Sequence, residues 1–261
     1  MSLPDFGFGN IEQELWRLIF TMVRIGAALI AAPIFGAATV PVQVRIVFAG
    51  AIAVFVLNWT PAGAVMPTDL LAIETMIASL TEAVVGFAFG FVLHLSFAAP
   101  VLAAEQIAGG MGMAIATAVD PNTGGPSGAL GQYFTVVLTL IFLSVGGHLL
   151  WLRLLIESYQ TFPPGAEWFG ADRAMMIVGF AAQMFATAVA IALPVTLVLL
   201  LVQMATGVLS RSAPSLNLFS LGLPAGVLAG IAALIAAMPM LTDLFVALAL
   251  DSVTHVAEIF G

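Results

Sequence analysis

Long apolar runs alternate with short polar or turn-forming stretches along this chain, and the pattern predicts helices that cross a membrane. A helix needs roughly 20 residues to span the hydrocarbon core, and most of the runs reach that length. The predicted fold class is therefore all-α, a polytopic integral membrane protein with about six hydrophobic helical segments. The segments expected are Leu15–Phe35, Val44–Trp59, Leu70–Ile115, Tyr133–Ile156, Ala174–Leu209 and Leu216–Leu250.

Proline is expected to interrupt several of these segments, because it removes a backbone donor and clashes with the preceding helical turn. Pro100 should kink or break the third segment, and Pro194 should interrupt the fifth. The sixth segment should be broken at Pro224 and Pro239. The last two segments are expected to form a helical hairpin.

The stretch Ala108–Gln132 departs from the apolar pattern. It is rich in glycine, and Asp120-Pro121-Asn122-Thr123-Gly124-Gly125 is a run of consecutive turn signals. Irregular backbone at membrane depth is tolerated only where protein buries it or where it lines a watery cavity, since an unpaired amide in hydrocarbon costs several kcal/mol. We therefore predict a glycine-rich loop at membrane depth and take it as the candidate functional centre.

Charged residues inside the apolar segments form a second candidate set. Arg24 lies near the middle of the first segment, where a charge is expensive unless it faces protein or water. Glu82, Gly86 and Gly90 recur every fourth residue, so one carboxylate and two small residues share a helical face suited to close packing. We predict Arg24, Glu82 and Glu105 as buried charges. A structural Arg24–Glu82 pair is favoured over a transport role, although the sequence does not show that the two side chains meet.

Composition changes the picture by excluding several classes of protein. With 62% hydrophobic and 8% charged residues and a mean hydropathy of +1.15, the chain lies outside the range of soluble domains. Its net charge of −8 leaves no basic face for nucleic acid or anionic lipid. The absence of cysteine excludes disulfides, thiolate chemistry and cysteine-based metal sites. The N-terminus has no basic region and is not expected to be a cleavable signal peptide.

No constellation of residues suited to catalysis is found. Gly125-Pro126-Ser127-Gly128 fits the Gly-x-Ser-Gly pattern of rhomboid intramembrane proteases, with His148 or His255 as the base, but so short a motif matches a glycine-rich stretch by chance. There is no phosphate-binding loop ending in lysine and no His-Glu pair at metal spacing. We therefore expect no enzyme activity, no cofactor and no metal.

The glycine-rich stretch also resembles the FliR family of the flagellar type III export apparatus and its injectisome counterparts. Met113 to Gly125, followed by Leu130-Gly131-Gln132, carries the resemblance. Further matching pieces cover nearly the whole chain. They are Arg24, Pro33-x-Phe35-Gly36, Pro41-x-x-x-Arg45, Gly147-His148, Ser158-Tyr159 before Pro164-Gly165, and Arg211-x-x-Pro214-x-x-Asn217-x-Phe219-x-x-Gly222-x-Pro224.

The resemblance implies a membrane subunit of the flagellar protein export gate, in the bacterial inner membrane at the flagellar basal body. Residues 1–170, with the glycine-rich loop 108–132, would fold like FliP, and residues 171–261 would form a FliQ-like hairpin. The implied partners are FliP-like and FliQ-like membrane subunits, FlhB-like and FlhA-like export components, membrane lipid and unfolded protein substrates in transit, without nucleic acid. The pore plug or gate would comprise Gly109, Gly110, Met111, Gly112, Met113, Asp120, Pro121, Asn122, Gly124 and Gly125.

The connection between the last two segments is expected on the cytoplasmic side. If six segments are counted, Arg45 and Arg211 lie on the side of the even-numbered crossings, whereas chiefly Arg173 lies on the opposite side. Loops that carry more arginine tend to be cytoplasmic. Arg211, Pro214 and Asn217 are thus assigned to a cytoplasmic hairpin turn.

Two alternatives stay open from the sequence. One is an export-gate subunit of an injectisome. The other is a small secondary transporter, with Arg24, Glu82, Glu105 and His148 as a proton or substrate path. A transporter would move solute by itself, and such proteins often show two halves with broken helices in corresponding positions, a pattern that is not obvious here.

Overall fold

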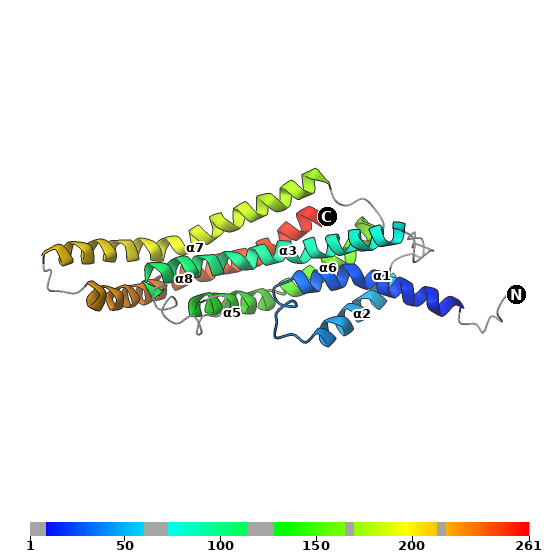
Figure 1. The fold of residues 1–261 in the computed structure, drawn as a ribbon, viewed down its shortest axis with the longest axis horizontal. Helices are drawn as coiled ribbons and strands as arrows, with labels where there is room; N and C mark the ends of the chain where they lie inside the picture. The colour runs from blue at the N-terminus through cyan, green and yellow to red at the C-terminus, as the bar shows by residue number, and fades with distance from the viewer. Residues whose placement is uncertain (1–8, 60–72, 114–127, 165–169, 213–217, 261) are drawn as a thin grey trace. The chain divides into compact units, whose positions relative to one another are not determined.

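The computed structural model describes residues 9–59, 73–113, 128–164, 170–212 and 218–260, with side chains placed from residue 14 and, in the last helix, from residue 222. These residues form helices and connecting turns, and no strand occurs among them (Figure 1). The all-α fold class is confirmed. The elements are α1 (Gly9–Ala31), α2 (Val42–Trp59), α3 (Ile73–Gly110), α5 (Ala129–Ser144), α6 (Gly147–Thr161), α7 (Ala171–Ser212) and α8 (Leu218–Phe260).

The helices confirm a polytopic membrane protein, with a span count that differs from the six segments expected. In the described part of the chain, 4 helices are long and apolar enough to cross a membrane, and the number rises to 5 if the bent α5–α6 pair forms one span. Helix α1 is not among them, because Glu14, Arg17 and Arg24 all lie within it. The charged residues of α1, rather than its length, are the reason that it is not counted among the membrane-spanning helices.

The prediction that proline breaks the long helices is wrong, and the alternative of a kink at Pro100 stays a prediction. Helix α3 continues through Pro100, α7 through Pro194, and α8 through Pro224 and Pro239. A proline within a helix removes one hydrogen bond, and membrane helices tolerate that loss because neighbouring groups satisfy the freed carbonyl. Near Pro100 the fully buried side chains of Ala99, Ala103 and Ala104 hold both sides of the helix in the core.

The fourth predicted segment, Tyr133–Ile156, is not one straight helix. It is divided into α5 and α6, which are bent by 69° at the break. Gly146 at the break has φ 74°, a left-handed conformation that glycine adopts without steric cost. Its carbonyl accepts hydrogen bonds from the N–H groups of Leu149 and Leu150 and so begins α6. Apolar character continues across the bend, which is why hydropathy alone does not reveal it.

The chain divides into two compact units, each assembled from separate stretches. The first comprises residues 1–94, 146–178 and 252–261, and the second comprises residues 95–145 and 179–251. Helices α3, α7 and α8 contribute residues to both units. The division into residues 1–170 and 171–261 concerns likeness to two partner subunits, and it stays a prediction.

Aromatic side chains fill the core of the first unit. The fully buried Trp151 of α6 stacks on Phe35 at a ring-centroid distance of 5.7 Å, and its indole N–H donates to the carbonyl oxygen of Phe89 on α3 at 3.4 Å. Phe89 in turn lies 3.7 Å from the ring of Phe260 at the end of α8. Together these contacts join α3, α6 and the C-terminal turn of α8.

The second unit has its own aromatic core. Phe97 of α3 contacts Phe142 of α5 edge to face at 5.5 Å, and Phe134 of α5 contacts Phe245 of α8 in the same way at 5.3 Å. All four of these rings are buried. Helix α5 is thereby fixed between α3 and α8 within this unit.

The turn between α1 and α2 depends on Gly36 and Arg45. Helix α1 ends at Ala31, two residues before Pro33, and a Cβ at Gly36 would collide with the carbonyl oxygens of Ile30 and Ala32. One Nη of Arg45 donates to the carbonyl oxygens of Gly36, Ala37 and Val40 at 3.3, 2.6 and 3.0 Å. The arginine therefore binds three carbonyl oxygens of the turn, of which that of Ala37 also accepts from the backbone N–H of Val40.

Candidate functional site

The contact between α1 and α3 depends on two glycines of α3. A Cβ added at Gly86 would collide with the carbonyl oxygen of Arg24, and one added at Gly90 would lie 2.6 Å from the Cβ of Ala31. Only glycine lets the two backbones approach this closely. The face carrying Glu82, Gly86 and Gly90 thus packs against α1, and the close approach brings the Glu82 carboxylate next to Arg24.

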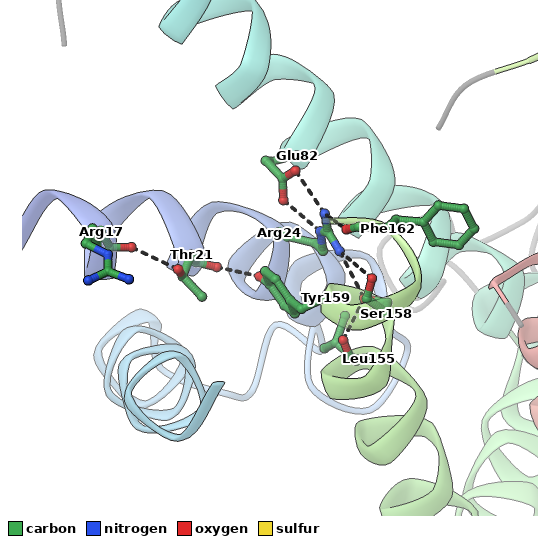
Figure 2. A network of polar contacts seen from close by, with 8 residues as sticks. All are labelled: Arg17, Thr21, Arg24, Glu82, Leu155, Ser158, Tyr159 and Phe162. Atoms are coloured by element: carbon green, nitrogen blue, oxygen red, sulfur yellow. Dashed lines mark hydrogen bonds and ion pairs between the residues drawn. The ribbon is translucent and has the colours of Figure 1, made fainter. Parts of the chain in front are cut away.

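Arg24 and Glu82 form a buried, two-point ion pair (Figure 2). The Nε of Arg24 donates to Oε2 of Glu82 at 2.7 Å, and Nη2 donates to Oε1 at 2.9 Å. Each residue is only 1% exposed. Paired N–H groups facing both oxygens of a carboxylate make a geometrically specific bond, and a lysine could not reproduce it.

The remaining N–H groups of Arg24 are directed at the end of α6. Nη1 donates to the carbonyl oxygen and to Oγ of Ser158 at 3.1 and 3.2 Å, and Nη2 also donates to the carbonyl oxygen of Phe162 at 3.0 Å. The last carbonyl groups of a helix lack partners within the helix, and this end of the helix dipole favours a cation. Arg24 therefore caps α6 while it neutralises Glu82.

Tyr159 completes the cluster. Its ring lies 4.2 Å from the guanidinium carbon of Arg24, within the range of a cation–π contact. Its hydroxyl donates to the carbonyl oxygen of Thr21 at 2.7 Å, and the hydroxyl of Thr21 donates to the carbonyl oxygen of Arg17 at 2.8 Å (Figure 2). These bonds tie α6 to α1, so the cluster holds α1, α3 and α6 together.

Ser158, Tyr159 and Phe162 are not among the site residues proposed from the sequence. The serine followed by an aromatic residue, ahead of a Pro-Gly turn, is the signal that could have indicated them. All the N–H groups of Arg24 are occupied, and both oxygens of Glu82 accept from them. This arrangement favours a structural ion pair over a proton or substrate path, because a transport group must exchange partners.

Glu105 differs from the expectation of a buried charge, since its side chain is exposed in this chain. One carboxylate oxygen accepts a hydrogen bond from the backbone N–H of Gly128 at 2.9 Å. Gly128 precedes α5, and a carboxylate near a helix N-terminus is favoured by the helix dipole. Glu105 thus links α3 to the start of α5.

The loop predicted over residues 108–132 is shorter in the structure, because α3 continues to Gly110 and α5 begins at Ala129. Gly109 and Gly110 are the last residues of α3, not part of a loop. Met111 is buried, Gly112 has φ 80°, and Met113 is exposed. The other plug or gate candidates lie outside the described residues: Asp120, Pro121, Asn122, Gly124 and Gly125.

The remaining candidates are dispersed. Arg211 lies in the last turn of α7, where a cation is favoured by the helix dipole, while Pro214 and Asn217 lie outside the described residues. Nδ1 of His148 is buried and has no hydrogen-bond partner within the described part of the chain. In the same part, no group of three or more His, Asp or Glu residues is placed to hold a metal ion.

These features define a class of protein: a multi-pass helical membrane protein whose buried charges serve to join its helices. Comparison with known proteins agrees with this class. The family described as "Bacterial export proteins, family 1" matches residues 15–251. This match covers most of the chain.

Individual relatives point to the same family. The chain is 30% identical to the flagellar biosynthetic protein FliR of Escherichia coli (strain K12), in a match covering 89% of this chain and 90% of that protein. It is 31% identical to the FliR protein of Bacillus subtilis (strain 168), covering 85% and 86%, respectively. For the FliR protein of Aquifex aeolicus (strain VF5) the identity is 30%, with 88% of each chain covered. The chain belongs to the FliR family of bacterial export proteins, which is not a family of enzymes.

Proposed function

We propose that this chain is a subunit of the flagellar type III protein export gate in the bacterial inner membrane, at the flagellar basal body. There it would form part of the channel for unfolded flagellar proteins and be required for flagellum assembly. The observation that carries the proposal is the match to an export family over residues 15–251. The relatives from Escherichia coli, Bacillus subtilis and Aquifex aeolicus are all named as flagellar biosynthetic proteins, which favours the flagellum over an injectisome.

The apolar surface of the single chain supports a place among other membrane subunits. Large apolar side chains are exposed along α7 and α8, including Phe185, Leu201, Val208, Leu228 and Ile235. Lipid can cover part of this surface, and close packing against other helices can cover the rest. FliP-like and FliQ-like subunits are the proposed neighbours, with FlhB-like and FlhA-like components nearby. Residues 1–170 and 171–261 would resemble FliP and FliQ, respectively.

If this surface is meant for partner subunits, the protein made alone should behave poorly in detergent, and co-expression should rescue it. We expect aggregated or polydisperse material from the chain alone and a defined complex when the FliP-like and FliQ-like subunits are present. Extraction followed by size-exclusion chromatography measures both. A stable, monodisperse monomer that does not bind the other subunits would contradict the proposal.

Residues Gly109–Gly131 are proposed to contribute the constriction or plug across the export path. A gate must seal against ions and yet admit an unfolded chain, so part of it needs low local stability. Two described features support the proposal: the left-handed Gly112 just beyond α3, and the bond from Glu105 to Gly128 just before α5. One lies at the start and the other at the end of the stretch that would form the seal.

Deleting Pro121–Ser127 from a functioning complex should increase the leak of small ions or dyes across the membrane while leaving the complex assembled. This deletion retains Gly128 and therefore the bond that its N–H donates to Glu105. Dye entry into cells, together with co-purification of the subunits, measures the two effects separately. A deletion complex that assembles normally and stays as tight as the parent would place the seal on another subunit.

A further inference from the structure

We propose that Met111 is a positioning residue that fixes the end of α3 to α8, while α7 holds the neighbouring Gly110, so that the glycine-rich stretch starts from an immobile anchor. The inference rests on the proposed gate function. It adds the position at which the chain segment held by α7 and α8 ends. It also assigns different roles to Met111 and Met113, which are both predicted from the sequence as plug or gate residues.

Met111 occupies a notch in α8 that two glycines create. A Cβ added at Gly230 would lie 2.6 Å from Cγ of Met111 and 3.0 Å from its sulfur, and would collide with its terminal methyl group. A Cβ added at Gly226 would lie 3.3 Å from the carbonyl oxygen of Met111. The Met111 side chain is 4% exposed, so the notch is filled and closed. The two glycines are spaced four residues apart and therefore face Met111 from the same side of α8.

Helix α7 holds the neighbouring residue. The side-chain amide of Gln203 donates to the carbonyl oxygen of Gly110 at 2.8 Å. This carbonyl group belongs to the last turn of α3, whose oxygen atoms have no partners within the helix. A Cβ added at Gly110 would lie 3.0 Å from a methyl group of Leu199, so α7 also packs closely against this turn. Two helices thus hold two consecutive residues by independent contacts.

The fixed region ends at Gly112. This residue has φ 80°, a left-handed conformation that glycine adopts at little cost. Met113, the next residue, has an exposed side chain and 37% of its surface accessible. The change from a filled notch to an exposed side chain within two residues marks the boundary of the anchor.

A disulfide tests this placement directly, because the chain contains no cysteine of its own. In the variant Met111→Cys with Gly230→Cys, the two Cβ atoms would lie within about 4 Å, the usual separation in a disulfide. The matched control is Met111→Cys with Gly207→Cys, since nothing lies within 4 Å of a Cβ added at Gly207. Both full-length variants would be expressed with their partner subunits in flagellated cells that lack their own copy.

If Met111 is a fixed anchor, the first variant should form the disulfide on oxidation, whereas the control should not. Export of filament protein and tightness to small dyes should be the same in oxidised and reduced cells. Failure to form the disulfide would contradict the packing of Met111 against Gly230 and would overturn the proposal. A disulfide that stops export, with recovery on reduction, would show that Met111 must leave the notch during export and would overturn the fixed anchor.

A second variant tests what the anchor does. Gly230→Ala should displace Met111 and raise dye leak by roughly tenfold, and adding Met111→Ala should reverse most of that rise because the new methyl group then has room. Gly207→Ala is the control and should leave the leak unchanged. Equal leak in Gly230→Ala and Gly207→Ala would refute the positioning role. If the cysteine-free parent itself fails to restore export, the proposed function fails instead.

Discussion

Arg24→Leu is expected to destabilise the protein by about 3–5 kcal/mol, because it leaves the Glu82 carboxylate buried without a partner. The double variant Arg24→Leu with Glu82→Leu should recover a large part of this loss, since neither charge then remains. Recovery should be incomplete, because the carbonyl oxygens of Ser158 and Phe162 lose their donor in both variants. Thermal unfolding of the purified complex in detergent, and the amount of assembled complex, would measure the difference.

An exposed ion pair within α6 supplies a matched control. Arg153 and Glu157 are 2.7 Å apart, but their side chains are 72% and 45% exposed. Solvent-exposed pairs contribute little, so Arg153→Leu should have a much smaller effect than Arg24→Leu. Equal losses in the single Arg24→Leu variant and the double variant would show that burial of an unpaired carboxylate is not what destabilises the protein.

Gly86→Ala should also be strongly destabilising, although it adds only one methyl group. That group would collide with the carbonyl oxygen of Arg24, which is backbone and cannot rotate away. Overpacking usually costs about 1–3 kcal/mol, and here it also displaces the backbone that carries the buried arginine, so we expect a loss at or above the upper end. The midpoint of thermal unfolding and the yield of complex are the measurements.

Gly26→Ala, within α1, is the control for this experiment. Nothing lies within 4 Å of a Cβ added there, and alanine is the better helix former, so the change should be neutral or slightly stabilising. A Gly86→Ala protein that unfolds at the same temperature as the Gly26→Ala protein would mean that α1 and α3 are not in close backbone contact.

Local sequence determined the class and much of the candidate site. The apolar runs predict the helices, because a span requires a fixed length of apolar chain whatever surrounds it. The spacing of Glu82, Gly86 and Gly90 predicts a packing face with one carboxylate, since residues four apart share a helical face. A family resemblance carried by short motifs predicted the FliR family, which the comparisons show.

Tertiary structure decided the features that depend on partners distant in sequence. Arg24 meets Glu82, 58 residues away, and Ser158, 134 residues away, and no periodicity encodes those distances. Helix α3 runs through Pro100 because packing against other helices outweighs the local preference of proline. The bend between α5 and α6 lies at Gly146, in an apolar run whose hydropathy does not mark it. Partners distant in sequence also decide the surroundings of Glu105 and Met111. Glu105 is exposed and accepts a hydrogen bond from Gly128, whereas Met111 is buried because two glycines of α8 leave a notch for it.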